Sequence, residues 1–504
     1  MDRAVLVYLL ALSGIFYVSA EIEDAHNVTE HNEESSTPTT RPMESTHAVI
    51  VNSTSDTWND LGKTTQLPTP TTSGLDDDLH NVPDNQSETE SKEKSSSEVN
   101  SVQTTVGEGD DGESCDENVS QEEIKKISQA LTSFSIDLLR DIDPNSQKPS
   151  VVISPYSIAL GLFQLSLGAG KDTQLKIMET LHIEPSDCLH NQIKFVTNEL
   201  TKSLLRVATR IYFKKGFNVK ESFLERSEKW YGSKPLNLAA NKEENLESIN
   251  DWVKEVTEGK IPHFLSDLPS NVMLMLLNAM HFKGIWKNKF NSSLTYQDLF
   301  YINDELTVPV EMMNAQKYPL SWFHLENIDS HVARLQFKGN MSFIVIMPSH
   351  SSWNMSTILA HVNHTDLCSR FPKEKPTNLR MPKFSLDYRL ELSQALSNLG
   401  LGQLFTDPDL KKISDEPLFV SSIEHEATLE LNEEGVEASA VTSIITSRSH
   451  SIYSVNRPFV FFLYDDTTGI PLFAGHVRNP NPDFQQKIDG FNEPQAFNKG
   501  SIPK

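Results

Sequence analysis

A proline-free run of small and β-branched residues near the carboxyl end constrains this chain most. It reads Gly-Val-Glu-Ala-Ser-Ala-Val-Thr-Ser-Ile-Ile-Thr-Ser-Arg-Ser and extends from Gly435 to Ser449. Because side chains alternate between the two faces of a strand, one uncharged face would hold Val436, Ala438, Ala440, Thr442, Ile444 and Thr446. Such a run can be displayed as a loop, and its small leading residues also let it fit between two existing strands. An ordinary long hairpin loop is the alternative.

The first 120 residues differ in composition from the rest of the 504-residue chain. Residues 1–20 predict a signal peptide, because Arg3 precedes an apolar run that ends in Val18-Ser19-Ala20. Residues 21–120 hold 23 Asp and Glu against 4 Lys and Arg, together with Ser/Thr/Pro clusters. This composition predicts a disordered, glycosylated acidic leader, and its charge argues against nucleic-acid binding. No later stretch is apolar for long enough to cross a membrane, so we expect a secreted, extracellular protein.

Eight Asn-x-Ser/Thr acceptors without an intervening proline predict N-glycosylation in a secreted chain. Their asparagines are Asn27, Asn52, Asn85, Asn118, Asn291, Asn340, Asn354 and Asn363.

The folded part is expected to begin near Ser120, which has capping-box spacing to Glu123. Helical stretches are expected at 156–181 and 246–257, and strands at 342–347 and 456–464. Mixed helices and mainly antiparallel strands over residues 121–480 predict one α+β domain. Residues 481–504 form a C-terminal extension to which the sequence assigns no role.

Motifs for an enzyme are missing from the sequence. There is no Gly-x-Ser-x-Gly elbow and no His-Glu-x-x-His helix, and the three cysteines cannot form a zinc cluster. The histidines are scattered without metal-ligand spacing. We therefore expect no enzyme activity, no cofactor and no metal.

Several blocks resemble the serpin family. They are Ser154–Ala159, Ile249–Val253, Asn278–Trp286, Leu429–Ala438, Asn456–Tyr464 and Thr468–Pro480. Because they stand in the family's order, the chain is identified as a member of the family. The resemblance implies a serpin fold with three β-sheets, about nine helices and an exposed reactive-centre loop.

The same resemblance assigns a reactive bond, Arg448-Ser449, and a loop hinge. The hinge comprises Glu434, Gly435, Val436, Glu437, Ala438, Ser439 and Ala440. Arg448 is the fourteenth residue from Gly435, where most serpins count fifteen. An arginine before the cut bond implies trypsin-like serine proteases, whose specificity pocket pairs a carboxylate with a guanidinium group. The implied mechanism is suicide inhibition, in which the cut loop inserts into the central sheet.

One plasma member of the family shares the shortened loop, the arginine and the Gly-Val-Glu-Ala hinge. If that likeness holds, the targets are complement first-component proteases, mannose-lectin-associated proteases, plasma kallikrein and activated factor XII. The function would then be control of complement activation and of the contact and kallikrein system, as a monomer.

The resemblance also implies a gate for loop insertion and one disulfide. The gate, which the family calls the shutter, comprises Ser154, Ser157, Asn278 and His425. The disulfide joins Cys115 to Cys188 and leaves Cys368 as a free or buried thiol. For His425 alone, a satisfied core histidine is the default interpretation.

Two other functions stay open. A noninhibitory serpin would act as a carrier or a cleavable precursor, although the small residues of this hinge permit insertion. A glycosaminoglycan site would rely on five basic residues that are scattered over helix and strand: Lys202, Arg206, Arg210, Lys214 and Lys215.

Overall fold

The computed structural model describes Cys115 and residues 119–142, 149–201, 206–269, 271–350, 355–362, 367–435 and 451–484. The predicted signal peptide, the leader apart from Cys115 and 119–120, and the C-terminal residues 485–504 lie outside the described residues. So do Val436 to Ala440 of the hinge and the Arg448-Ser449 bond. The predicted domain boundaries therefore stay predictions.

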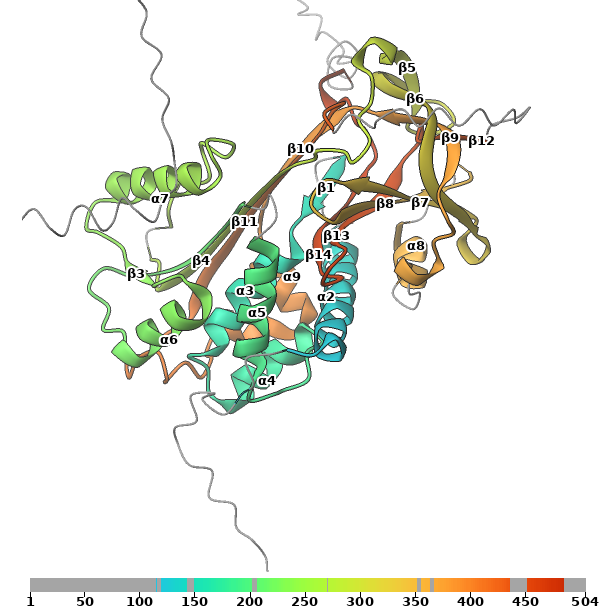
Figure 1. The fold of residues 1–504 in the computed structure, drawn as a ribbon. Coiled ribbons are helices and arrows are strands. Elements are labelled where there is room, and N and C mark those ends of the chain that lie inside the picture. Colours follow the sequence, from blue (N-terminus) through green and yellow to red (C-terminus); the bar gives the residue numbers. More distant parts are fainter. Residues whose placement is uncertain are drawn as a thin grey trace, which may run out of the picture. The chain divides into compact units, whose positions relative to one another are not determined.

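A five-stranded sheet forms one half of the described structure (Figure 1). Its order is β10 (Phe384–Glu391), β11 (Val420–Leu431), β4 (Leu274–Lys283), β2 (Arg206–Phe213) and β3 (Leu236–Asn237). The two central strands, β11 and β4, are parallel, whereas β10 and β2 run antiparallel to them. The sheet thus has a parallel pair at its centre, where pairing is slightly weaker per residue.

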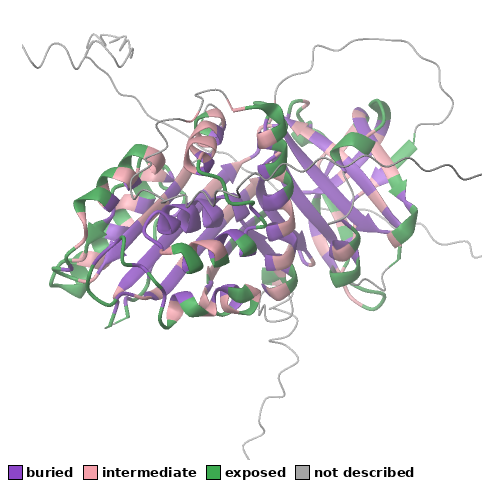
Figure 2. Cartoon of the chain, turned by 90° about the horizontal axis from the view of Figure 1, so that it is seen from below, coloured by how far each residue is buried: buried purple, intermediate pink, exposed green. Residues whose placement is uncertain are grey.

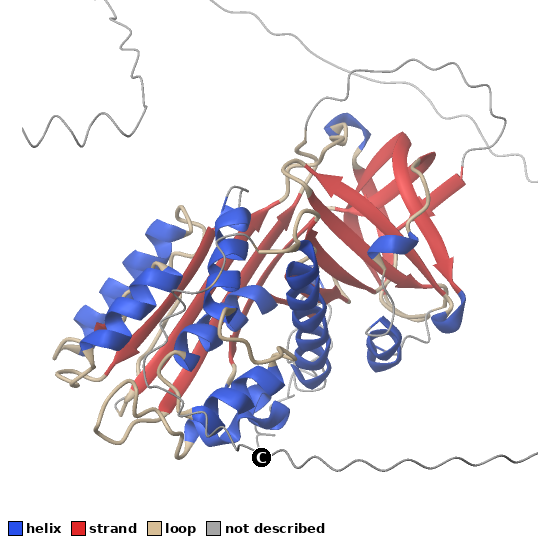
Figure 3. Cartoon of the chain, turned by 60° about the horizontal axis from the view of Figure 1, so that its bottom comes forward, coloured by secondary structure: helices blue, strands red, loops and turns tan. Residues whose placement is uncertain are grey.

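Helices cover both faces of this sheet, and the alternation along β4 shows which face each helix buries (Figure 3). Leu276 and Met280 join the core that contains α3 (Pro155–Ser166), while Met275 and Leu277 join a second cluster with α7 (Lys242–Val256). Every residue of α3 is buried. The strand therefore reads as a continuous apolar run, as expected of a strand covered on both sides.

The remaining helices pack around α3 and the sheet ends. They are α2 (Gln121–Ile142), α4 (Lys171–Thr180), α5 (Leu189–Thr201), α6 (Glu221–Tyr231), α8 (Met355–Val362) and α9 (Ser393–Leu396). The predicted capping box at the start of α2 is present: the Ser120 amide donates to Glu123 at 2.8 Å, and the Glu123 amide donates to the Ser120 hydroxyl at 3.3 Å. None of the helices that the structure describes is long and apolar enough to cross a membrane.

The other strands form a second, nine-stranded sheet. Its path is β1 (Ser150–Ile153), β14 (Pro471–Val477), β13 (Phe459–Asp465), β8 (Met341–Pro348), β7 (Ser330–Phe337), β6 (Thr307–Leu325), β9 (Lys375–Pro382) and β12 (Ser451–Ser454). A ninth strand, β5 (Tyr296–Tyr301), pairs with β6.

Two of the three expected sheets are continuous through β6. The first part of β6 pairs with β5 and β9, and its last part pairs with β7. The pairing with β9 crosses a register shift between Ala315 and Tyr318 and continues to Leu320, and the pairing with β7 begins at Ser321. Lys317, inside the shift, has a left-handed φ of 56°. Bulges of this kind bend a strand and increase its twist. The strands of both sheets are largely buried in Figure 2.

Candidate functional site

The parallel pair β11 and β4 is the place in the fold where another strand could enter. Residues 436–450 follow β11 after a short connection. A segment that folds back after β11 runs antiparallel to β11, and therefore also antiparallel to β4. Between these two strands it would replace one parallel ladder by two antiparallel ladders. Because the run of small residues follows β11 closely, its insertion there needs no long connection.

The connection that precedes the run is held by Trp286, three residues after the end of β4. The Trp286 indole N–H donates to the carbonyl of Asn432 at 2.7 Å, and its backbone N–H donates to the carbonyl of Glu434 at 2.9 Å. Trp286 is fully buried, and its ring stacks on Phe337 with centroids 4.2 Å apart. The start of the loop is thus fixed against the core and is not a loose hinge.

A glycine is required at position 435 because the backbone there lies too close to the backbone of Trp286 and Lys289 for a side chain to fit. A Cβ atom at this position would lie 2.6 Å from the Trp286 carbonyl oxygen and 2.7 Å from the Cα of Lys289. Both are backbone atoms, so neither can move aside cheaply. Gly435 does not have a left-handed φ. The hinge role of Gly435 during loop insertion stays a prediction.

Two glutamates of the connection are tied to different lysines. Glu433 accepts from the Thr295 hydroxyl at 2.8 Å and lies 3.4 Å from Lys383, with 16% of its side chain exposed. Glu434 lies 2.8 Å from Lys283 and is 56% exposed. Burial raises the pKa of Glu433, but hydrogen bonds from its own backbone and from Thr295, together with the Lys383 charge, hold that pKa below its ordinary value. The connection is therefore anchored by two glutamate carboxylates, of which Glu433 is the more buried.

The structure brings together the four residues that the resemblance assigned to the gate. Ser154 caps the N-terminus of α3 and accepts from the backbone N–H of Ser157 at 3.3 Å. The backbone N–H of Ser154 donates to His425 Nε2 at 3.0 Å. His425 and Asn278 are opposite each other in the β11–β4 ladder. All four are buried. Because Ser154 and Ser157 are at the start of α3, Asn278 is in β4 and His425 is in β11, the group links α3 to both central strands.

Within the described residues, two polar atoms of this group, Asn278 Oδ1 and Asn278 Nδ2, have no hydrogen-bond partner. His425, by contrast, interacts with the Asn278 backbone, and Ser422 interacts with Glu424. A buried polar atom without a hydrogen bond costs roughly 1–3 kcal/mol. The two Asn278 atoms can bond to a new strand as the ladder opens, so the gate role stays a prediction with a physical basis. Sequence reasoning missed Met280, whose sulfur accepts from the Ser154 hydroxyl at 2.7 Å.

We expect acid to destabilise the protein partly through His425. Burial lowers the pKa of His425 to about 3, so it stays neutral and its Nε2 can accept the Ser154 bond. The unfolded chain, with a histidine pKa near 6.5, takes up a proton on this histidine before the folded chain does. The contribution of His425 to the free energy of unfolding is therefore fully present above about pH 6.5 and decreases toward pH 3, by up to about 1.4 kcal/mol per pH unit. Urea unfolding midpoints from pH 7.5 to 4.5 should fall less steeply in His425→Gln than in the wild type.

The exposed His263 provides the matched control for that measurement. His263→Gln should keep the wild-type acid slope. An unchanged slope in His425→Gln would show that His425 does not carry the acid sensitivity.

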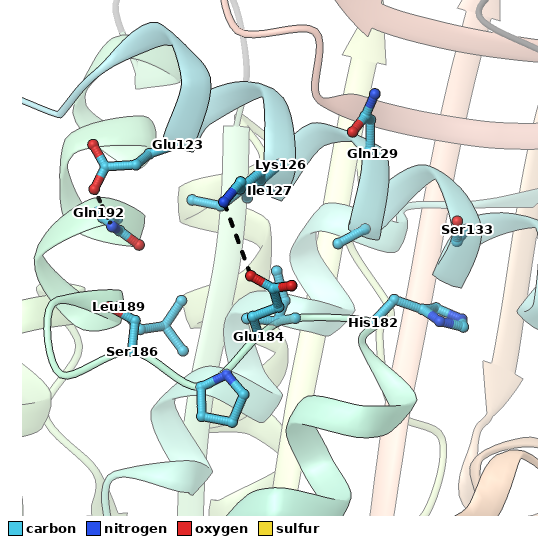
Figure 4. A pocket seen from close by; sticks show the side chains of 13 residues that line it. Glu123, Lys126, Ile127, Gln129, Ser133, His182, Glu184, Ser186, Leu189 and Gln192 are labelled. Carbon is cyan, nitrogen blue, oxygen red and sulfur yellow. Dashed lines mark hydrogen bonds and ion pairs between the residues drawn. The ribbon is translucent and has the colours of Figure 1, made fainter. Parts of the chain in front are cut away.

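Cys115 and Cys188 form a disulfide with Cα atoms 5.6 Å apart, and Cys368 is exposed. Beside Cys188, a cavity of about 480 Å³ lies between α2 and the connection from α4 to α5 (Figure 4). Its walls carry a hydrogen bond of 2.7 Å between Gln192 and Glu123 and an ion pair of 3.9 Å between Lys126 and Glu184. These contacts tie the start of the domain to its body. Among the described residues, no cluster of three or more His, Cys, Asp or Glu could hold a metal.

The other predicted residues divide between described and undescribed parts of the chain. Asn291 and Asn340 are exposed, whereas Asn27, Asn52, Asn85, Asn118, Asn354 and Asn363 lie outside the described residues. Glycan occupancy stays a prediction at all eight. Of the basic residues considered for glycosaminoglycan, Arg210 stacks on Trp252 at 4.1 Å and Lys214 lies 3.7 Å from Glu416. These side chains already have local partners.

Comparison with known proteins gives concordant matches. A family model described as "Serpin (serine protease inhibitor)" matches residues 129–480. Alpha-2-antiplasmin of Bos taurus is 46% identical over 402 residues, covering 78% of this chain and 82% of that protein. Plasma protease C1 inhibitor of Homo sapiens is 31% identical over 363 residues, covering 70% and 71%. The solved structure of mouse protein-Z dependent protease inhibitor matches with a TM-score of 0.65 at 25% identity, covering 71% of this chain and 98% of that one.

Proposed function

Because the chain belongs to the serpin family, whose α+β fold it has, we propose that it is a secreted suicide inhibitor of trypsin-like serine proteases. The family itself is one of serine protease inhibitors, so the target class is a serine protease. The observation that carries the proposal is the adjacent parallel pair β4 and β11, with the run 436–448 a short connection after β11.

The choice of protease changes with the comparisons. The plasma serpin that shares the shortened loop is C1 inhibitor, from which complement and contact-system targets were expected. Identity to it is 31%, against 46% to alpha-2-antiplasmin of Bos taurus, so C1 inhibitor is not the best guide. We therefore propose plasmin as the first target and fibrinolysis as the process, with the complement and contact proteases as the alternative.

The proposed reaction begins with cleavage of the reactive bond and ends with insertion of the loop into the sheet. The protease serine attacks the Arg448 carbonyl, the Arg448-Ser449 bond breaks, and the protease remains as an ester on Arg448. The segment from Gly435 to Arg448, now separated from Ser449, then enters between β4 and β11. Its insertion adds ladder hydrogen bonds and buries its small apolar face. Movement of the attached protease distorts its oxyanion hole before water can cleave the ester.

A panel of proteases tests the proposal. The full-length glycosylated protein is mixed with plasmin, plasma kallikrein, activated factor XII and a complement first-component protease, and the products are separated under denaturing conditions. We expect a covalent complex that survives detergent and forms fastest with plasmin. A faster reaction with kallikrein or the complement protease would restore the alternative targets. Clean cleavage without complex for every protease would make the chain a noninhibitory serpin.

A further inference from the structure

The strand β5 carries an unusual share of the exposed apolar surface. Of the six large apolar side chains that are exposed in the described part of the chain, four lie on β5 or just before it: Leu294, Tyr296, Leu299 and Tyr301. Leu299 and Tyr301 are 46% and 47% exposed and, being two residues apart, share one face of the strand. Pro309 of β6 is opposite Leu299 in the ladder. We call Leu299, Tyr301 and Pro309 the β5 face.

The end of the described chain lies against this hairpin. The Asn481 side-chain amide donates to the carbonyl of Pro309 at 2.8 Å. Phe484, the last described residue, packs half-buried against the main core. Residues 485–504 therefore leave the structure next to the β5 face, and they follow the end of the family match at residue 480.

The sequence of this tail contains residues that suit an apolar surface, and its three lysines are nearly balanced by Asp489 and Glu493. Its apolar residues are Ile488, Phe491, Phe497 and Ile502, and its lysines are Lys487, Lys499 and Lys504. Of the acidic residues of the hairpin, Glu311 is on the same face as Leu299 and lies 3.4 Å from Lys383, whereas Asp298 belongs to the opposite face. Because the tail is covalently attached beside the surface, its effective concentration there is high, and a modest contact suffices for docking.

We propose that residues 485–504 dock in the same molecule on the β5 face. The docked tail lies near the point at which the reactive loop rejoins the fold, because the backbone N–H of Tyr301 donates to the Asn456 carbonyl at 2.9 Å, two residues after β12. The tail is thereby positioned beside any protease that engages the loop. Docking is independent of the proposed inhibitory activity, because it needs neither Arg448 nor a protease.

Hydrogen exchange on the full-length protein tests the docking. The amides of 486–504 should exchange about tenfold more slowly than an unprotected chain in the wild type, because docking removes them from water. The double variant Leu299→Ser/Tyr301→Ser should lose this protection. Leu236→Ser is the matched control, because Leu236 is an equally exposed strand leucine, at 44%, on a different sheet. It should leave the tail protected, and thermal unfolding should show that both variants remain folded.

Three results would overturn the proposal. In the first, the tail exchanges at unprotected rates in the wild type, or stays protected in the double variant. In the second, protection depends on protein concentration, which would make the occupant of the β5 face a second copy of the chain. In the third, the β5 face becomes protected only when a protease is bound, which would assign the face to the protease.

Discussion

Replacing Arg448 by alanine is expected to abolish covalent complex formation with plasmin or trypsin, lowering the second-order rate of inhibition by about 10⁴-fold. The specificity pocket of a trypsin-like protease buries a carboxylate that pairs with the guanidinium group, and a site built around such a polar pair rejects a ligand that lacks it by roughly this factor. The measurement is the progress curve of protease activity at several inhibitor concentrations, with the complex followed by denaturing electrophoresis.

Two further variants show whether the loss of inhibition is caused by the missing guanidinium group. Arg448→Lys keeps the charge but not the bidentate geometry, so an intermediate loss of about 10- to 100-fold is expected. Ser447→Ala changes the adjacent residue and should alter the rate only a few-fold. If Arg448→Ala still forms complex at the wild-type rate, or if the cut maps after Ser449, Arg448 is not the residue before the reactive bond.

The fold was predictable where several local signals agree. Ser120 and Glu123 set the start of α2 through a capping box that involves only neighbours in sequence. The joined sheets were not predictable, because no local signal marks the step from Leu320 to Ser321 at which β6 changes from pairing with β9 to pairing with β7. Propensity describes single strands and does not report a strand that serves two sheets.

The candidate site was predictable in its members but not in its contacts. The resemblance named His425 and Asn278, and only the ladder register shows them opposite each other. The Glu433–Lys383 pair was missed, because the two residues are fifty positions apart and nothing in the sequence marks Lys383 among the other lysines. Trp286 lay in a block that resembled the family, but its indole bond to Asn432 requires the folded chain.

Cleavage of the loop after Arg448, without a trapped protease, is expected to raise the thermal unfolding midpoint by about 10–15 °C. An inserted strand between β4 and β11 adds on the order of ten net ladder hydrogen bonds at about 1 kcal/mol each. With an unfolding entropy of about 2.1 cal/mol/K per residue, each kcal/mol corresponds to roughly 1.3 °C in a domain of about 360 residues. If the loop inserts in this way, the uncut protein is held in a less stable form by the closed ladder and the anchored connection. Brief trypsin treatment followed by calorimetry gives the shift.

The alternation of the loop supplies a matched pair of variants for this prediction. Ala440 is on the uncharged face, so Ala440→Glu would carry a charge into the sheet and should remove most of the rise, at a cost of several kcal/mol for an unpaired buried carboxylate. Ser439→Glu, one position earlier and on the opposite face, should keep most of it. Equal shifts in the two variants would show that the run does not enter as a strand with this face buried. No shift in the cut wild type would exclude insertion and leave a cleavable, noninhibitory serpin.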